Sequence, residues 1–136
     1  MDGESQVTVP HLYRVILPVS DIGLAAKFYG YVFQDDGQRV SPGRHYFDCD
    51  GVILACYDPS ADGDDVGQGW LHHENQYLYF SVSDLVAVRD RIEKGGGRNL
   101  TEIESMPWGE RVFYALDPLG SRLSFVDAST LFTGSE

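Results

Sequence analysis

Residues 107–127, PWGERVFYALDPLGSRLSFVD, contain two alternating apolar runs joined by an Asp-Pro-Leu-Gly turn. On both sides of the turn, apolar residues recur at every second position, which is the period of a strand with one buried face. These residues are Val112, Tyr114, Leu116, Leu123 and Phe125. Asp-Pro favours a turn, and Gly120 can adopt the positive φ that such turns often require. The stretch therefore predicts a β-hairpin.

A second stretch has the same organisation. Residues 44–58, RHYFDCDGVILACYD, again place two alternating runs around a turn that contains Asp and Gly. Asp48 and Gly51 correspond to Asp117 and Gly120, at an offset of 69 residues. A second hairpin is therefore predicted, and the chain contains an internal repeat.

The segments that precede the hairpins also repeat. VILPVSDIGLAAKFY and LYFSVSDLVAVRDRI share Val-Ser-Asp at an offset of 63 residues. In each, an alternating run is followed by a Ser-Asp pair, which favours a helix N-cap, and then by apolar residues at helical spacing. Short strands are also expected at residues 38–40 and 100–103. Each half is thus predicted to be a strand, a helix and three strands.

The expected fold class is α+β, with two βαβββ modules that form curved mixed sheets around a cup. The modules span about residues 11–58 and 75–128 of a single domain, residues 1–136. The segment between them, residues 59–74, begins with many Asp and Gly residues and is expected to be a solvated linker. Because one helix covers only one face of a four-stranded sheet, the modules must combine, within one chain or across a dimer.

Composition narrows the possible partners. The 136 residues include 10 Lys and Arg against 21 Asp and Glu, a net charge of −11 that disfavours binding to nucleic acid or to an anionic membrane. The N-terminal sequence has no signal-peptide pattern, and no apolar run approaches membrane-spanning length, so we expect a cytoplasmic protein. Cys49 and Cys56 are accordingly expected to be reduced, packed thiols.

Two motifs in register with the repeat resemble the vicinal oxygen chelate superfamily, which includes glyoxalase I, extradiol dioxygenases, and the fosfomycin and bleomycin resistance proteins. The first is strand-Val-Ser-Asp-helix with an aromatic pair near the helix end, and the second is a Pro-Trp-Gly turn followed by Asp-Pro and Gly. The residues are Phe28, Tyr29, Pro107, Trp108, Gly109, Asp117, Pro118 and Gly120. The resemblance extends over residues 12–126 and implies the fold described above.

The resemblance also implies where a divalent metal would lie, because enzymes of this superfamily hold one with His, Gln or Glu from the first and last strands of each half. The matching positions here carry Arg14, Ala55, Tyr77 and Ser124. Arg has no lone pair to donate, Ala has no donor atom, and neutral Ser and Tyr are poor ligands. We therefore expect no metal and no cofactor. Residues 72–74, His-His-Glu, are alternative ligands, but they lie beside the linker and lack a standard zinc spacing.

The matching positions are still expected to point into the cup, because side chains two residues apart share a face. The expected lining is Arg14, Ile16, Ala55, Tyr57, Tyr77, Tyr79 and Ser124, with Arg122 at the rim and Trp108 either as a lid or in the core. An apolar and aromatic cavity with a few donors is typical of a small-molecule site. The alternative is that the tyrosines fill the cup or form a dimer contact.

Two functions are compatible with this lining. The preferred one is a metal-free protein that binds or sequesters a small molecule, similar to the bleomycin resistance proteins. The alternative is a lyase, isomerase or dioxygenase of the glyoxalase/dioxygenase type with an atypical or metal-independent site, in which Tyr77 or Tyr79 transfers a proton beside Arg14. No catalytic residue is assigned, and a purely structural role stays open. A homodimer is expected from the resemblance alone.

The charge of the ligand can be argued in two directions. Arg14 favours a small, partly aromatic anion, because guanidinium can bind a carboxylate or phosphate through two hydrogen bonds. The net charge of −11 and the bleomycin resistance analogy favour a cation. Local groups set the bound geometry, so we prefer the anion.

Overall fold

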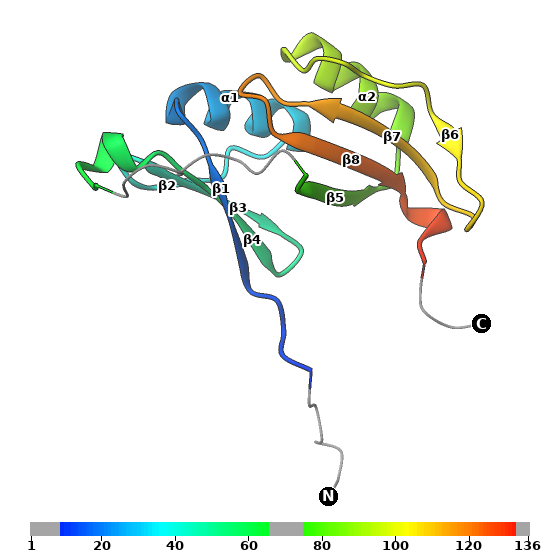
Figure 1. Ribbon diagram of the computed structural model, residues 1–136, viewed down its shortest axis with the longest axis horizontal. Helices are drawn as coiled ribbons and strands as arrows, with labels where there is room; N and C mark the ends of the chain where they lie inside the picture. Colours follow the sequence, from blue (N-terminus) through cyan, green and yellow to red (C-terminus); the bar gives the residue numbers. More distant parts are fainter. Residues whose placement is uncertain (1–8, 66–74, 133–136) are drawn as a thin grey trace, which may run out of the picture.

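The computed structural model describes residues 9–65 and 75–132. The described chain forms two modules, each a four-stranded sheet with one α-helix (Figure 1). The first module contains β1 (Arg14–Pro18), α1 (Ile22–Phe33), β2 (Gln38–Ser41), β3 (Arg44–Cys49), β4 (Val52–Tyr57) and the 3₁₀ helix η2 (Pro59–Asp62). The second contains β5 (Tyr77–Val82), α2 (Leu85–Lys94), β6 (Glu104–Ser105), β7 (Arg111–Leu116), β8 (Arg122–Asp127) and η3 (Ala128–Thr130).

Both sheets are mixed and have the same topology. Their strand orders are β1-β4-β3-β2 and β5-β8-β7-β6. In each, the first strand runs parallel to the last, and the other neighbours are antiparallel. The α+β class with two βαβββ modules is thereby confirmed. Among the described strands none joins the two sheets, so β1 and β5 each end a sheet and no closed barrel forms.

The helices begin where the repeat predicts. A carboxylate oxygen of Asp21 accepts the backbone N–H of Leu24 at 3.0 Å, and Asp84 accepts that of Ala87 at 3.1 Å. One stripe of each helix is buried against its sheet. The buried residues are Ile22, Ala25, Phe28, Tyr29 and Val32 in α1, and Leu85, Val88 and Ile92 in α2.

The closing hairpin differs from its prediction in which face the helix covers. Phe113 and Ala115 of β7 lie in the core, opposite Phe125 and Leu123 of β8, whereas Tyr114 faces away from the helix. Both faces of β7 carry apolar side chains, so alternation alone does not identify the covered one. The covered face of β7 is identified by its partners, because Phe125 and Leu123 of β8 face the core.

The strand predicted at residues 100–103 is wrong, because only Glu104 and Ser105 form β6. Thr101 attaches this segment to β7 instead. Its backbone N–H donates to the carbonyl of Tyr114, and its side-chain oxygen accepts the Tyr114 N–H, both at 2.9 Å. The Thr101 side chain thus accepts the Tyr114 N–H in place of a backbone carbonyl.

The start of the expected solvated linker is also ordered against the first sheet. Asp62 accepts the hydroxyl of Ser41 at 2.7 Å and the backbone N–H of Gly43 at 2.5 Å, and it forms an ion pair with Arg44. Polar contacts therefore hold a segment that has few apolar side chains. The rest of the linker, residues 66–74, including His72, His73 and Glu74, lies outside the described residues.

The two modules pack through their helices, which lie on the same side of the molecule in Figure 1. The rings of Phe33 and Phe80 are 5.4 Å apart, and Nε of Arg91 donates to the carbonyl of Val32 at 3.0 Å. One shared core therefore spans both modules. No helix in the described ranges is long and apolar enough to cross a membrane.

Candidate functional site

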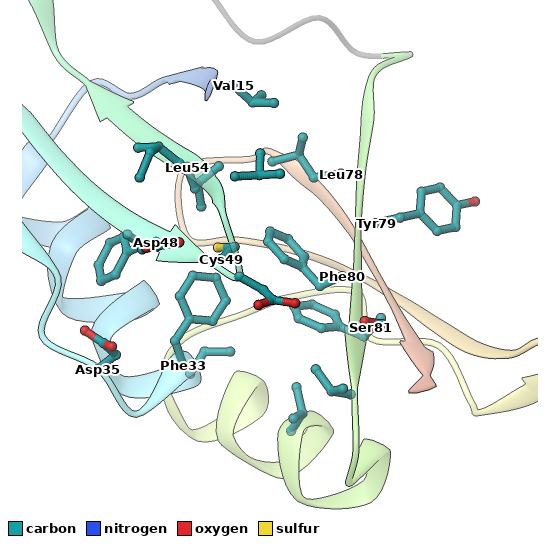
Figure 2. Close-up of a pocket in the computed structure, with 18 of the residues that line it drawn as sticks. Val15, Phe33, Asp35, Asp48, Cys49, Leu54, Leu78, Tyr79, Phe80 and Ser81 are labelled. Carbon is teal, nitrogen blue, oxygen red and sulfur yellow. The ribbon is translucent and has the colours of Figure 1, made fainter. Parts of the chain in front are cut away.

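Each sheet has one face turned away from its helix, and we call these the inner faces. In the first sheet, Ile16 lies beside Ala55, and Pro18 beside Tyr57. In the second, Tyr77 lies beside Arg122, and Tyr79 beside Ser124. Figure 2 shows the alternation in β5, where Leu78 and Phe80 point to one side of the strand and Tyr79 to the other. The predicted lining residues on the strands therefore lie on the inner faces, divided between the two sheets.

Arg14 is the exposed cation of the first inner face. Its Nη1 donates to the hydroxyl of Tyr46 at 3.0 Å, and its Cζ lies 5.1 Å from the ring centre of Tyr13 and 5.6 Å from that of Tyr46. These are cation–π distances. No ion pair to Arg14 is found in residues 9–65 and 75–132. Sequence reasoning missed Tyr46, which the pairing with Ala55 places on this face.

Tyr57 is buried at the other end of the same face. Its hydroxyl donates to Asp64, and the guanidinium of Arg44 lies 4.2 Å above its ring. The hydrogen bond to Asp64 raises the pKa of Tyr57. Its hydroxyl is thus engaged by the protein.

Three tyrosines form a cluster on the second inner face. The rings of Tyr77 and Tyr79 lie 6.1 and 6.4 Å from that of Tyr114, with planes at 80° and 90°, which is an edge-to-face geometry. Cζ of Arg122 lies 5.9 Å from the Tyr77 ring. The hydrogen bond with the Tyr79 hydroxyl raises the pKa of Tyr114 to about 12. Tyr114 was not among the predicted lining residues because its hairpin face was assigned to the core.

Small residues lie between the large ones on both faces. Ala55 pairs with both Ile16 and Tyr46, and Ser124 pairs with both Tyr79 and Tyr114. Ala55 and Ser124 are buried. Each sheet therefore carries a small side chain in the middle of an otherwise bulky row.

Trp108 is exposed in the turn between β6 and β7, so it does not belong to the core. Its indole Nε1 donates to Oε1 of Glu110 at 2.8 Å. The lid role stays a prediction.

The donor chemistry of the inner faces does not fit a divalent metal. The four positions implied by the resemblance carry guanidinium, methyl, phenol and hydroxyl groups on Arg14, Ala55, Tyr77 and Ser124. No group of three or more His, Cys, Asp or Glu in the described part of the chain could hold a metal ion. His45 is used elsewhere, since its Nε2 lies 2.7 Å from the carbonyl of Asp36.

A cleft of about 840 Å³ lies between the modules, with its lining shown in Figure 2. Its apolar wall comes from the helix side of both sheets and includes Val15, Leu54, Leu78 and Phe80. Tyr77 and Tyr79 also border the cleft, although the Tyr79 ring points to the opposite side of β5 from Leu78 and Phe80 (Figure 2). Sequence reasoning missed the cleft because it depends on how the modules are placed relative to each other.

The chain was compared with known protein families, curated proteins and solved structures. The family model described as Glyoxalase/Bleomycin resistance protein/Dioxygenase superfamily matches residues 10–125. No curated protein matches the chain.

Solved structures with the same fold include three informative cases. A glyoxalase-related enzyme from Fulvimarina pelagi is 21% identical, with a TM-score of 0.71 over 87% of this chain and 88% of that one. A glyoxalase/bleomycin resistance protein from Albidiferax ferrireducens T118 is 17% identical, with a TM-score of 0.68 over 84% and 96%. A lactoylglutathione lyase from Agrobacterium tumefaciens is 17% identical, with a TM-score of 0.66 over 88% and 94%. At these identities the likeness shows the fold alone.

Proposed function

Because the chain belongs to the Glyoxalase/Bleomycin resistance protein/Dioxygenase superfamily, we propose that it binds and sequesters a small, partly aromatic anion without a metal. The observation that carries the proposal is the guanidinium of Arg14, which is exposed between the rings of Tyr13 and Tyr46 and has no carboxylate partner in the described part of the chain. A planar guanidinium in this setting can bind a carboxylate or phosphate through two hydrogen bonds.

The second inner face supplies the aromatic part of the site. Tyr77 and Tyr79 are exposed, and their rings offer faces on which a planar ligand can stack. The net charge of −11 slows the approach of an anion, but the groups in contact set the bound geometry. The inner faces therefore favour an aromatic anion over an aromatic cation.

Binding without chemistry is supported by the same groups. A tyrosine that acts as a base at neutral pH needs a lowered pKa, whereas the pKa of Tyr114 is raised by its hydrogen bond with Tyr79. Arg14 contacts Tyr13 and Tyr46 and not the tyrosines of β5. Among the described residues of one chain, Arg14 and the tyrosines of β5 are thus not assembled into a proton-transfer pair.

A homodimer completes the proposed site. Within the described residues, no strand pairs with the outer edge of β1 or of β5, and exposed apolar side chains lie beside both edges. These are Val9, Leu12, Tyr13 and Ile16 near β1, and Tyr77 and Tyr79 on β5. A second copy would cover them and bring its own inner face opposite. The arginine of one copy and the tyrosines of the other then line one cup.

An enzyme is the second candidate, and the fold of the lactoylglutathione lyase from Agrobacterium tumefaciens favours it. In a dimer, Arg14 of one copy could reach Tyr77 or Tyr79 of the other and assist a metal-independent lyase, isomerase or dioxygenase reaction. The two candidates differ in outcome, because a sequestering protein returns its ligand unchanged. Mass analysis of the ligand after incubation distinguishes them.

The test of the proposed function is a calorimetric titration with 2-naphthoate and with 2-naphthylmethylammonium, which share one ring system and differ in charge. Naphthoate is expected to bind the native protein, and Arg14→Ala to weaken it about tenfold or more, the loss of one charged contact of about 1.5–3 kcal/mol. Lys27→Ala removes an equal charge from the exposed side of α1 and is expected to leave the affinity within twofold. Binding of the cation with no loss in Arg14→Ala, or of neither ion, contradicts the proposal.

A further inference from the structure

The hydroxyl of Ser124 is a buried polar group without a partner. Ser124 is 0% exposed, and its Oγ makes no hydrogen bond within the described residues. A hydroxyl buried without a hydrogen bond is unfavourable, and native proteins contain few of them. The group therefore requires an explanation beyond packing.

The cover over this hydroxyl consists of two side chains. Tyr79, Ser124 and Tyr114 lie in one row across β5, β8 and β7. Strands two apart in a sheet are separated by about 10 Å, yet the rings of Tyr79 and Tyr114 are only 6.4 Å apart. The two rings therefore lean toward each other above Ser124 and together cover it.

One side of the cover is exposed to solvent. Tyr79 is 58% exposed and lies on β5, which ends its sheet. In Figure 2 its ring points to the opposite side of β5 from Leu78 and Phe80. The hydroxyl of Ser124 can therefore be uncovered by a rotation of Tyr79 about its side-chain bonds, with the strand in place.

A planar ligand has the shape to enter at this point. Tyr77 and Tyr79 are two residues apart on one face of β5, which separates them by about 7 Å. A flat ring that stacks on Tyr79 in this space would present its edge to Ser124. Since a serine hydroxyl donates a hydrogen bond, the edge needs an acceptor atom.

We propose, resting on the proposed function, that Tyr79 and Tyr114 cover a recognition site whose polar group is the Ser124 hydroxyl, and that the bound anion carries a hydrogen-bond acceptor on its aromatic ring. The hydroxyl then gains its missing partner only in the complex. A ligand that lacks the acceptor leaves it unpaired and binds more weakly.

The test compares 2-naphthoate with the isomeric quinolinecarboxylates, which differ from it by one ring nitrogen. At least one isomer is expected to bind the native protein about tenfold more tightly than naphthoate, equivalent to about 1.4 kcal/mol. Ser124→Ala is expected to abolish this preference and to leave naphthoate affinity within twofold. A preference that is absent in the native protein, or that persists in Ser124→Ala, overturns the inference.

Ser121 provides a matched control. It is also buried with an unpartnered Oγ, but it lies in the turn between β7 and β8, where its backbone N–H donates to Asp117. Ser121→Ala is expected to keep the full preference for the ring nitrogen. If Ser121→Ala abolishes the preference as well, the effect belongs to the core and the inference is wrong.

The stability of Ser124→Ala is an independent test of the inference. Ser124→Ala removes an unpaired hydroxyl, so the ligand-free protein is expected to unfold at the same temperature or a few degrees higher. A lower unfolding temperature would identify Ser124 as a structural partner and refute its role in recognition.

If native protein binds no naphthoate and no quinolinecarboxylate, the proposed function fails together with this inference. If naphthoate binds without a dependence on Ser124, only this inference fails.

Discussion

The hydroxyl of Tyr29 donates a 2.5 Å hydrogen bond to Oδ2 of Asp117, and this bond joins α1 of the first module to the turn between β7 and β8 of the second. Both residues are fully buried. Oδ1 of Asp117 accepts the backbone N–H groups of Leu119 and Ser121 at 2.8 and 2.9 Å. Burial and the neighbouring carboxylate raise the pKa of Tyr29 well above its usual value. The contact joins the two modules, together with the Phe33–Phe80 ring contact and the hydrogen bond from Arg91 to Val32.

Tyr29→Phe is expected to lower the free energy of unfolding by about 1–3 kcal/mol, because it removes the donor to a buried carboxylate oxygen. Urea denaturation measures the change. Tyr31→Phe is the control, since Tyr31 lies on the same helix but is exposed. Loss of its hydroxyl should change the free energy of unfolding by less than about 0.5 kcal/mol. Equal urea midpoints for Tyr29→Phe and the native protein would show that this bond does not hold the modules together.

The hydrogen bond between Tyr114 and Tyr79 predicts a loss of stability at high pH. A pKa raised to about 12 favours the protonated phenol in the folded state, so its stabilising effect is complete below the unfolded value of about 10 and is lost as the pH rises toward 12. Thermal unfolding from pH 9 to 12 should therefore fall more steeply for the native protein than for Tyr114→Phe. Parallel curves would mean that the folded-state pKa of Tyr114 is not raised.

The two thiols are expected to react slowly in the folded protein. Burial raises the pKa of Cys56 to about 12, and burial is also the largest cause of the raised pKa of Cys49. Because the thiolate is the reactive form, little of it is present at pH 8. Mass spectrometry after iodoacetamide treatment should find Cys56 unmodified until urea is added, and Cys49 modified more slowly than in urea. Rapid labelling of Cys56 under native conditions would contradict this burial.

The proposed dimer predicts a mass in solution of twice the 15.1 kDa chain. Leu12→Asp places a charge beside the open edge of β1, where the side chain is 64% exposed, and should shift the population toward monomer. Val86→Asp, at 65% exposure on α2, is the matched control and should leave the mass unchanged. Light scattering measures both. A monomeric native protein removes the dimer and leaves the fold intact.

The fold could be predicted because local signals repeat. The Ser-Asp pairs at both helix starts and the Asp and Gly residues in both hairpin turns each have a local physical cause. Residue alternation then placed Arg14 and Tyr79 on inner faces. These assignments need only the chain within a few residues of each position.

Less of the site could be predicted, because it depends on contacts between distant segments. One contact between the modules joins Tyr29 to Asp117, which are 88 residues apart. The role of Tyr114 was hidden because both faces of β7 are apolar. Ser124 is buried without a hydrogen-bond partner because of its neighbours on β5 and β7, and spacing along the sequence does not reveal those neighbours.

The inner faces are proposed to bind an aromatic anion at the positions where the family resemblance implies a metal. The most direct measurement is a calorimetric titration of chelator-treated protein with 2-naphthoate, repeated after addition of zinc, nickel or manganese. Naphthoate should bind the chelator-treated protein, with an affinity that the added metal changes by less than twofold. Binding that appears only after a metal is added would contradict the account.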